Sequence, residues 1–256
     1  MISFEIKNNV AYILLDRPDK YHSFIKEMAL ELQEKISLCQ KNNEIRAVVL
    51  TAKGKAFCAG QDLKEATDPN GPSLQEIVHE HYNPLIKKIR ALEKPIICAV
   101  NGVAAGAGAS IALSCDIVIA KENASFVQAF SKIGLIPDSG STFFLPRLIG
   151  MNKASALMMT GEKISAYEAE RIGMIYKVYN EEIFEEETIK LANKLASMPT
   201  KALALTKNLL NLSLTNSLEK QLEDEENHQV IAGNTNDYKE GVNAFLEKRK
   251  PNFKGN

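Results

Sequence analysis

Two turns rich in glycine and alanine, each directly after an apolar segment, constrain the fold of this chain most. The first turn is FCAGQD, residues 57–62, and it follows the apolar run 47–51. The second is NGVAAGAGAS, residues 101–110, and it follows the apolar run 95–100. Small residues let a backbone approach a ligand closely, and a turn that begins a helix leaves N–H groups without partners. If the two turns meet, their N–H groups form a site for developing negative charge, as an oxyanion requires.

The length and composition are typical of a globular protein with a large core. The chain has 256 residues, of which 45% are hydrophobic and 25% charged, and its net charge is -1. Such a charge gives no general attraction to nucleic acid or to anionic membranes. No apolar run approaches the ~20 residues that span a membrane, and no signal-peptide pattern is present. We therefore expect a cytoplasmic protein with no nucleic-acid or membrane partner.

Cysteine and histidine usage argues against disulfides and metal sites. Four widely spaced cysteines are expected to be reduced thiols: Cys39, Cys58, Cys98 and Cys115. His79 and His81 are two residues apart and would point in different directions on a helix, while His22 and His228 are isolated. We therefore predict no metal site.

Hydrophobic periodicity predicts alternating strands and helices in the first part of the chain. The predicted strands are 2–7 and 10–15, joined by a turn at Asn8-Asn9, then 47–51, 95–100 and 116–120. The predicted helices carry Phe24, Met28, Leu32 and Ile36, then a stretch capped by Ser73 and Glu76 and kinked or divided at Pro84, then a short helix ending at Leu113. The segment 126–146 mixes apolar residues with glycines and prolines, so we expect it to be irregular and site-forming.

Helices dominate the remainder of the chain. We expect a helix capped by Ser165 and Glu168, a short strand 175–179, and helices 182–197, 200–214, 217–232 and 237–249. Strand–helix alternation followed by helices alone is typical of an α/β core with a helical tail. We accordingly divide the chain into an α/β core, residues 1–195, and a helical C-terminal region, residues 196–256. That region should pack on the core or on a neighbouring subunit.

The loop LIPDSG, residues 135–140, carries the candidate general base. A thioester that forms an enolate at two N–H donors also needs a base near the carbon that loses its proton. Asp138 stands on this apolar, proline-directed loop, where burial would raise the pKa of its carboxyl toward a useful range. The alternative is that Asp138 caps a helix beginning near Ser139.

The second turn does not match a phosphate-binding loop. No Lys-Ser or Lys-Thr pair follows its glycines, and Gly106-Ala107-Gly108 lacks the third glycine of a dinucleotide fingerprint. The turn therefore serves either an oxyanion-type site or tight helix–strand packing.

Three ordered motifs resemble those of the enoyl-CoA hydratase/isomerase family, also called the crotonase superfamily. They are KAFCAGQDL at 55–63, KPIICAVNGVAAGAGASIALSCDIVIA at 94–120 and KIGLIPDSGSTFFLPRLIG at 132–150. The likeness runs from the first hairpin to GVNAFLEKRKPNF at 241–253, which is nearly the whole chain. It implies a crotonase-like α/β spiral of repeated ββα units. It also implies a helical C-terminal trimerisation region, and hence a homotrimer or a dimer of trimers.

The resemblance further implies an active site. The N–H groups of Gln61 and Ala107 match the oxyanion hole of the family, which binds the carbonyl of an acyl-CoA substrate. Asp138 matches the catalytic aspartate of family members that isomerise dienoyl-CoA or the ring-epoxide CoA thioester of phenylacetate degradation. The resemblance implies no cofactor beyond coenzyme A as the acyl carrier.

Two departures from the family pattern bear on the reaction. The glutamates that handle water in the hydratases correspond here to Ser110 and Phe130, and neither can act as a general base at neutral pH. The resemblance therefore implies an isomerase that shifts a double bond or rearranges a ring epoxide, with Asp138 as its single acid/base. The alternatives are an enoyl-CoA hydratase of fatty-acid β-oxidation and a catalytically silent acyl-CoA-binding scaffold.

Substrate contacts are expected from the two turns and the segments beside them. The candidates are Ala59, Gly60, Asp62, Leu63, Tyr82, Gly106, Phe130, Ile136 and Phe144. Phe130, Phe143 and Phe144 either line an apolar acyl pocket or pack in the core. The basic residues near the end either meet the phosphates of CoA or form a solvated tail: Lys248, Arg249, Lys250 and Lys254.

Overall fold

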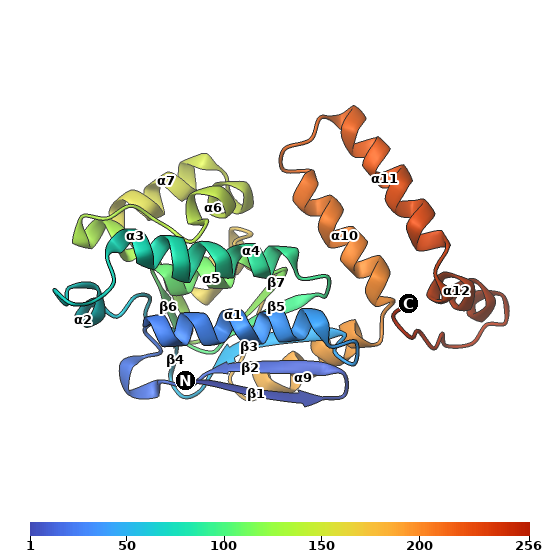
Figure 1. Ribbon diagram of the computed structural model, residues 1–256, viewed down its shortest axis with the longest axis horizontal. Helices are drawn as coiled ribbons and strands as arrows, with labels where there is room; N and C mark the ends of the chain where they lie inside the picture. Colours follow the sequence, from blue (N-terminus) through green and yellow to red (C-terminus); the bar gives the residue numbers. More distant parts are fainter.

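The computed structural model describes residues 1–256 and contains a six-stranded sheet and a four-stranded sheet with helices around them (Figure 1). The larger sheet has the strand order β1-β2-β3-β5-β7-β10. Its strands are β1 (Ile2–Lys7), β2 (Val10–Leu15), β3 (Ala47–Ala52), β5 (Ile96–Val100), β7 (Ile117–Lys121) and β10 (Lys177–Tyr179). The β1–β2 hairpin is antiparallel and the other pairs are parallel. The predicted turn is confirmed, because Asn8 and Asn9 both have positive φ, 52° and 61°.

The four-stranded sheet was not predicted. It has the order β4-β6-β8-β9, from strands β4 (Ala56–Cys58), β6 (Val103–Ala105), β8 (Ser125–Val127) and β9 (Lys163–Ser165). Each strand has three residues, which is too short to produce a recognisable alternation of apolar and polar residues. Strands β4 and β6 belong to the two small-residue segments, so this sheet holds those segments side by side.

The helices of the core follow the predicted order, with additional short elements. They are η1 (Pro18–Lys20), α1 (Lys26–Lys41), α2 (Leu63–Ala66), α3 (Leu74–Glu76), the π-helix η2 (Ile77–Tyr82), α4 (Asn83–Ala91), α5 (Ala107–Ser114), η3 (Ala129–Ile133), α6 (Ser141–Ile149), α7 (Met151–Thr160), α8 (Ala166–Arg171) and α9 (Phe184–Ala196). The capping box of Ser73 and Glu76 and the cap at Ser165 are confirmed. Pro84 is at the start of α4, directly after the π-helix η2, so the helix is divided close to the predicted position by a change of hydrogen-bond pattern.

The larger sheet is covered on both faces. Along β3, Val48 and Leu50 belong to the main core, whereas Ala47 and Val49 pack toward α9. Alternate residues of a strand point to opposite faces, so a strand that is apolar at every position is expected to be buried on both sides. α1 is among the elements that supply the other face of the main core, through residues such as Leu32 and Ile36.

The segment 126–146 is more regular than we expected. It contains the end of β8, the 3-10 helix η3 and the first part of α6, and its irregular part is residues 134–140. Pro146 lies inside α6 rather than ending it. The glycines suggested a loop throughout, but each marks a helix boundary: Gly134 ends η3 and Gly140 precedes α6, both with positive φ.

The C-terminal helices project from the core as an arm on the right of Figure 1. They are α10 (Thr200–Leu212), α11 (Leu218–Gly233) and α12 (Asn236–Leu246), close to the predicted bounds. α9, which precedes them, packs against the larger sheet through Phe184, Ala192 and Ala196. None of the helices has the length and apolar character needed to cross a membrane.

Polar contacts join this arm to the core. The buried ammonium of Lys207 on α10 lies 2.9 Å from the Asp116 carboxylate and donates to the Ile89 carbonyl oxygen at 2.8 Å. Arg90 pairs with the other oxygen of Asp116 at 3.2 Å and donates to Asn211. Burial lowers the pKa of the Lys207 ammonium, because desolvation opposes its charge.

A second junction forms at Arg46, directly before β3 of the larger sheet. The guanidinium of Arg46 donates to the Met198 carbonyl oxygen at 2.7 Å, to the Thr200 hydroxyl at 3.0 Å and to the Phe253 carbonyl oxygen at 2.8 Å. One side chain of the core therefore holds both the start of the arm and the returning tail.

Candidate active site

The two small-residue turns meet, which is the condition that the proposed oxyanion site requires. A Cβ placed on Gly60 would lie 3.0 Å from the Ala105 carbonyl oxygen and 3.5 Å from the Ala107 nitrogen. A Cβ on Gly108 would lie 2.6 Å from both the Cβ and the carbonyl oxygen of Cys58. Only glycine permits an approach this close at either position, so the residue type is explained by the contact between the turns.

The first turn is held so that the N–H of Gln61 is left free. The Phe24 N–H donates to the Gly60 carbonyl oxygen at 2.7 Å, and the Asp62 N–H donates to the Phe24 carbonyl oxygen at 2.8 Å. The Ala59 N–H donates to the Tyr21 carbonyl oxygen at 2.9 Å. The neighbours of Gln61 are thereby fixed to the segment before α1, while its own N–H donates to none of the turn and loop carbonyls.

The second turn places Ala107 at the first position of α5. Gly106 has φ 51° and ψ -126°, a conformation that suits glycine, and its N–H donates to the Val127 carbonyl oxygen at 2.9 Å. The N–H of the first helical residue has no partner within its helix. Ala107 is buried and lies beside Gly60, so an unpaired donor of each turn lies in the same region.

Asp138 is not a helix cap, and that alternative is wrong. α6 begins at Ser141 with Gly140 as its N-cap residue, and no side chain caps it. The Asp138 carboxylate accepts instead from the Ser139 hydroxyl at 2.8 Å. Burial raises the pKa of the Asp138 carboxyl above its usual range, and the Ser139 hydrogen bond opposes part of that rise.

Tyr82 is bound to the first turn. Its hydroxyl donates to the Oε1 of Gln61 at 2.6 Å. Burial is the main cause that raises the pKa of the Tyr82 phenol, and the neighbouring acidic groups Cys58, Asp138 and Glu65 add to the rise. The side chain of Tyr82 is 1% exposed, and its hydroxyl faces Gln61 rather than an open cavity.

Ser110 and Phe130 both lie at the second turn. The Ser110 hydroxyl is buried and donates to the Gly106 carbonyl oxygen at 3.1 Å. The Phe130 ring lies 3.8 Å from the position that a Cβ on Gly106 would take. Neither position carries a carboxylate. The acidic side chains at the first turn, Asp62 and Glu65, are already bound to Arg17 and to the Gln61 amide, which leaves Asp138 as the candidate base.

The other predicted substrate residues have differing environments. Asp62 caps α2 through the Lys64 N–H and pairs with Arg17 at 2.8 Å, so its carboxylate is already neutralised. Leu63 and Ile136 are 52% and 81% exposed. Phe144 packs against Gly140 and lies 5.6 Å below the Arg90 guanidinium, on the side of α6 that faces α10.

The segment before α1 supports the site, although none of its residues was among the predicted site residues. Tyr21 and His22 have positive φ, 48° and 54°, a conformation that is rare for such residues and marks a strained turn. His22 accepts the Arg17 N–H on Nδ1 at 3.0 Å and therefore donates from Nε2 to the Lys53 carbonyl oxygen at 2.6 Å. The signal available in the sequence was the Arg17-Pro18-Asp19 turn.

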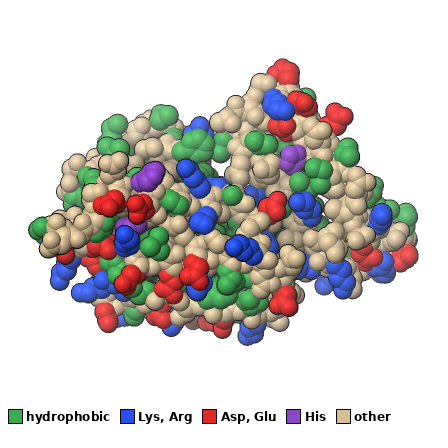
Figure 2. Space-filling model, in the orientation of Figure 1, with side chains coloured by type: hydrophobic (Ala, Val, Ile, Leu, Met, Phe, Trp, Pro, Cys, Tyr) green, Lys and Arg blue, Asp and Glu red, His purple; other side chains and the backbone are tan.

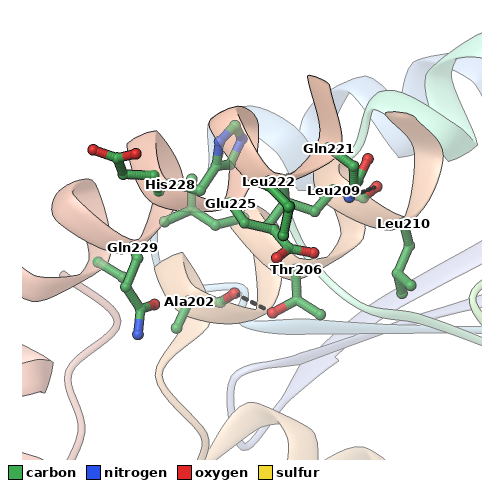
Figure 3. A pocket seen from close by; sticks show the side chains of 12 residues that line it. Ala202, Thr206, Leu209, Leu210, Gln221, Leu222, Glu225, His228 and Gln229 are labelled. Atoms are coloured by element: carbon green, nitrogen blue, oxygen red, sulfur yellow. Dashed lines mark hydrogen bonds between the residues drawn. The ribbon is translucent and has the colours of Figure 1, made fainter. Parts of the chain in front are cut away.

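The structure groups no three histidine, cysteine or acidic side chains in a way that could hold a metal ion. A cavity of about 650 Å³ lies far from the two turns, between α10 and α11 (Figure 3). Leu209, Leu222 and His228 are among its lining residues, and it contains none of the predicted site residues. Volume alone therefore does not locate the chemistry of this protein.

Comparison with known proteins assigns the family. The family described as Enoyl-CoA hydratase/isomerase matches residues 5–256. The chain is 46% identical to "1,2-epoxyphenylacetyl-CoA isomerase" of Escherichia coli, over 98% of this chain and 97% of that protein. It is 42% identical to "Probable enoyl-CoA hydratase" of Rhodobacter capsulatus, over 99% of this chain and 98% of that protein. The solved structure of an enoyl-CoA hydratase from Bacillus anthracis superimposes with a TM-score of 0.94 at 35% identity, covering 100% and 99% of the two chains.

This chain belongs to the enoyl-CoA hydratase/isomerase family and has the crotonase fold. The predicted fold class and the family resemblance are therefore confirmed, and the protein is an enzyme of this family. The relatives include both an isomerase and a hydratase by name, so the reaction has to be argued from the site.

Proposed function

We propose that this protein is an acyl-CoA isomerase that uses Asp138 as its single acid/base. The observation that supports this most directly is one partly buried carboxyl group with a raised pKa, together with two turns whose N–H donors are unpaired. The loop that carries this carboxyl is joined by the Leu135 N–H to the carbonyl oxygen of Phe130, whose ring lies beside the second turn. A raised pKa makes the carboxylate a stronger base and brings its pKa closer to neutral pH, where one group can both take up a proton and give it back.

The proposed reaction is a proton shuttle through an enolate. The thioester oxygen accepts hydrogen bonds from the N–H groups of Gln61 and Ala107. The Asp138 carboxylate removes a proton from a carbon of the acyl chain, and the electron pair of that C–H bond passes into the conjugated system and onto the thioester oxygen. The protonated Asp138 then gives the proton to a different carbon, so the double bond moves and no atom is gained or lost. Each N–H donor of this kind is worth about 10²–10³ in rate.

Hydration is the alternative reaction, and the name of the Rhodobacter relative favours it. Addition of water requires a group that activates the water molecule in addition to one that handles the proton on carbon. The Ser110 hydroxyl donates a hydrogen bond to a backbone carbonyl, and Phe130 has no ionisable group. These contacts favour isomerisation over hydration.

The acyl group is the finer part of the proposal. We favour an aromatic or ring-epoxide acyl group, for which the same N–H pair and Asp138 support rearrangement of an epoxidised phenylacetyl-CoA to an oxepin. The name of the Escherichia coli relative and the apolar Phe130 ring beside Gly106 support this choice. A linear enoyl group would use the same residues.

Coenzyme A is the expected carrier, with no metal or redox cofactor. Among the basic residues near the end, Arg249 is already paired with Glu240 at 2.6 Å and with Glu247 at 2.6 Å. Lys248, Lys250 and Lys254 form no ion pair in this chain and remain the candidates for the CoA phosphates.

A homotrimer or a dimer of trimers is the proposed assembly. α11 has no buried residue in the single chain, and its apolar side chains Leu218, Leu222 and Val230 are 70%, 55% and 61% exposed. Figure 2 shows hydrophobic side chains between charged ones at the surface of the C-terminal helices. A surface of this kind is typical of an interface between subunits.

Substitution of Asp138 tests the reaction. Asp138→Asn keeps the size of the side chain but cannot take a proton, so turnover of 3-enoyl-, dienoyl- and ring-epoxidised phenylacetyl-CoA should fall about 10²- to 10⁴-fold. Binding of a saturated acyl-CoA, measured by calorimetry, should persist. Equal turnover by Asp138→Asn and the parent would reject the proposal.

Two further measurements separate the alternatives. Robust water addition to crotonyl-CoA by the parent would favour the hydratase. Binding without turnover across the whole substrate panel would favour the silent scaffold. Selective turnover of the ring-epoxide substrate would identify the acyl group.

A further inference from the structure

The side chain of Gln61 is held by hydrogen bonds at both ends. The Tyr82 hydroxyl donates to its Oε1 at 2.6 Å, and its Nε2 donates to the Oε2 of Glu65 at 2.8 Å. A carboxylate can only accept, so it must face the amide nitrogen, and this leaves the oxygen for the phenol. The amide therefore has a single orientation and cannot rotate without losing both hydrogen bonds.

Both partners of this amide are themselves fixed. The second oxygen of Glu65 accepts the Lys26 N–H at 2.9 Å, at the start of α1. Tyr82 is fully buried, and its ring meets the ring of Phe24 edge-on, with 6.0 Å between centroids. Tyr82 is the last residue of the π-helix η2, and single π-turns within helices occur frequently at functional sites.

The main chain on either side of Gln61 is restrained by the same neighbour. Phe24, which packs on Tyr82, also forms the two backbone hydrogen bonds that bracket Gln61. A main-chain N–H donor needs no side chain, since glycine or alanine presents the same group. A glutamine anchored at both ends therefore adds restraint to a position whose main-chain neighbours are already paired.

We propose that Tyr82 and Glu65 are positioning residues that hold the N–H of Gln61 at the thioester oxygen through the Gln61 side chain. The inference rests on the proposed role of that N–H in the reaction. Charge on the thioester oxygen grows as the enolate forms, so a displaced donor weakens the transition state more than the bound substrate. Loss of the restraint should therefore lower kcat more than it changes KM.

Three substitutions remove the restraint without removing the N–H. Gln61→Met retains the length of the side chain but not its polar end, Tyr82→Phe removes one hydroxyl, and Glu65→Ala removes the acceptor. Each should lower kcat about tenfold with KM within about twofold. Glu65→Gln retains an oxygen that can accept from Gln61, so it should recover most of the activity lost in Glu65→Ala.

Matched controls lie elsewhere in the chain. Gln40 at the far end of α1 is also bound at both ends of its amide, to Glu93, so Gln40→Met tests the general cost of losing such an amide. Tyr167 is 56% exposed, and its hydroxyl lies 3.4 Å from Glu122, so Tyr167→Phe is the control for Tyr82→Phe. Both control variants should keep the parent kcat.

The carbonyl stretch of a bound thioester separates positioning from folding. A saturated acyl-CoA labelled with ¹³C at the thioester carbonyl is bound to each protein and measured by infrared difference spectroscopy. The parent should lower the carbonyl frequency relative to free acyl-CoA, and Gln61→Met and Tyr82→Phe should lower it less. The double variant Gln61→Met/Tyr82→Phe should have a kcat no lower than that of the more impaired single variant, because both substitutions act through the same amide.

The outcomes distinguish the two proposals. A parent that leaves the carbonyl frequency unchanged would overturn the proposed N–H role itself. A parent that lowers the frequency, with variants that match it in both frequency and kcat, would overturn the positioning role alone. Additive losses in the double variant would also contradict it.

Discussion

Helices α5 and α11 differ completely in their exposure to solvent. All the residues of α5, from Ala107 to Ser114, are buried, whereas α11 has no buried residue. α5 can enter the core because its residues are mostly small, and Gly108 lies directly against Cys58. α11 leaves side chains such as Leu222 at the surface. Helix α5, which begins at the second turn, therefore completes its packing within one chain, while α11 leaves apolar surface uncovered.

The largest effect expected from this contrast is that of a methyl group added to α5. In Gly108→Ala the new Cβ would lie 2.6 Å from Cys58, so the two turns must separate. We expect the free energy of unfolding to fall by about 3 kcal/mol, and turnover to fall with it. Urea unfolding and steady-state kinetics measure the two effects.

Gly233→Ala makes the same change in α11. No atom lies within 4 Å of the new Cβ, and alanine favours a helix over glycine, so we expect a gain of up to about 1 kcal/mol. Similar losses in both variants would contradict the distinction between the two helices.

A smaller loss is expected when the polar junction between the arm and the core is cut. Lys207→Met removes the ammonium that lies 2.9 Å from Asp116, but Asp116 keeps its contact with Arg90. Because the carboxylate is not left alone, we expect the free energy of unfolding to fall by about 2 kcal/mol, less than for a fully orphaned buried charge.

Lys220→Met is the control on α11. Lys220 is paired with Glu223 at 2.9 Å and Asp224 at 3.0 Å at the surface, where such pairs contribute about 1 kcal/mol or less. Thermal unfolding of both variants measures the difference. A larger loss in Lys220→Met would show that the junction at Lys207 is not what joins the arm to the core.

Charge on the apolar face of α11 should affect assembly more than folding. Leu222→Lys changes a side chain that is 55% exposed, so we expect the unfolding free energy of the single chain to change by about 0.5 kcal/mol or less. If α11 lies in a subunit interface, sedimentation velocity should show a lower molecular mass for the variant. An unchanged mass would place the interface elsewhere.

The smallest change concerns the acidity of Asp138. The Ser139 hydroxyl donates to its carboxylate and so lowers its pKa, while burial raises it. Ser139→Gly removes that hydroxyl at φ 53°, where glycine is unstrained. The pKa of Asp138 should then rise further, so the acid limb of the kcat/KM profile should move to higher pH because the carboxylate form is the base. A shift to lower pH would contradict this assignment.

The sequence was sufficient to predict structure where an apolar pattern is repeated or where a local motif requires particular residue types. Apolar runs such as 47–51 and 95–100 predicted the buried parallel strands, and Ser73 with Glu76 predicted a capping box. The small residues of the two turns indicated a close backbone approach, and the structure shows that Gly60 and Gly108 make this approach to the opposite turn.

The sequence was insufficient to predict features that depend on contacts between distant parts of the chain. The strands of the smaller sheet are too short to show a period, and they form because β4 and β6 bring the turns together. Asp138 has the same local pattern whether it caps a helix or stands free, and the start of α6 at Ser141 decides between them. The hydrogen bond from Tyr82 to Gln61 joins residues whose positions in the sequence give no sign of contact.

Arg46 closes a long loop without a covalent bond. Its guanidinium is bound to Thr200, where α10 begins, and to Phe253, where the tail returns. Because both ends of residues 200–253 are fixed to the start of β3, the conformations available to the helices between them are restricted. The entropic cost of closing such a loop rises only slowly with its length. The C-terminal helices are thus attached to the core at both ends, and loss of the contact at Phe253 would also weaken the attachment at the start of α10.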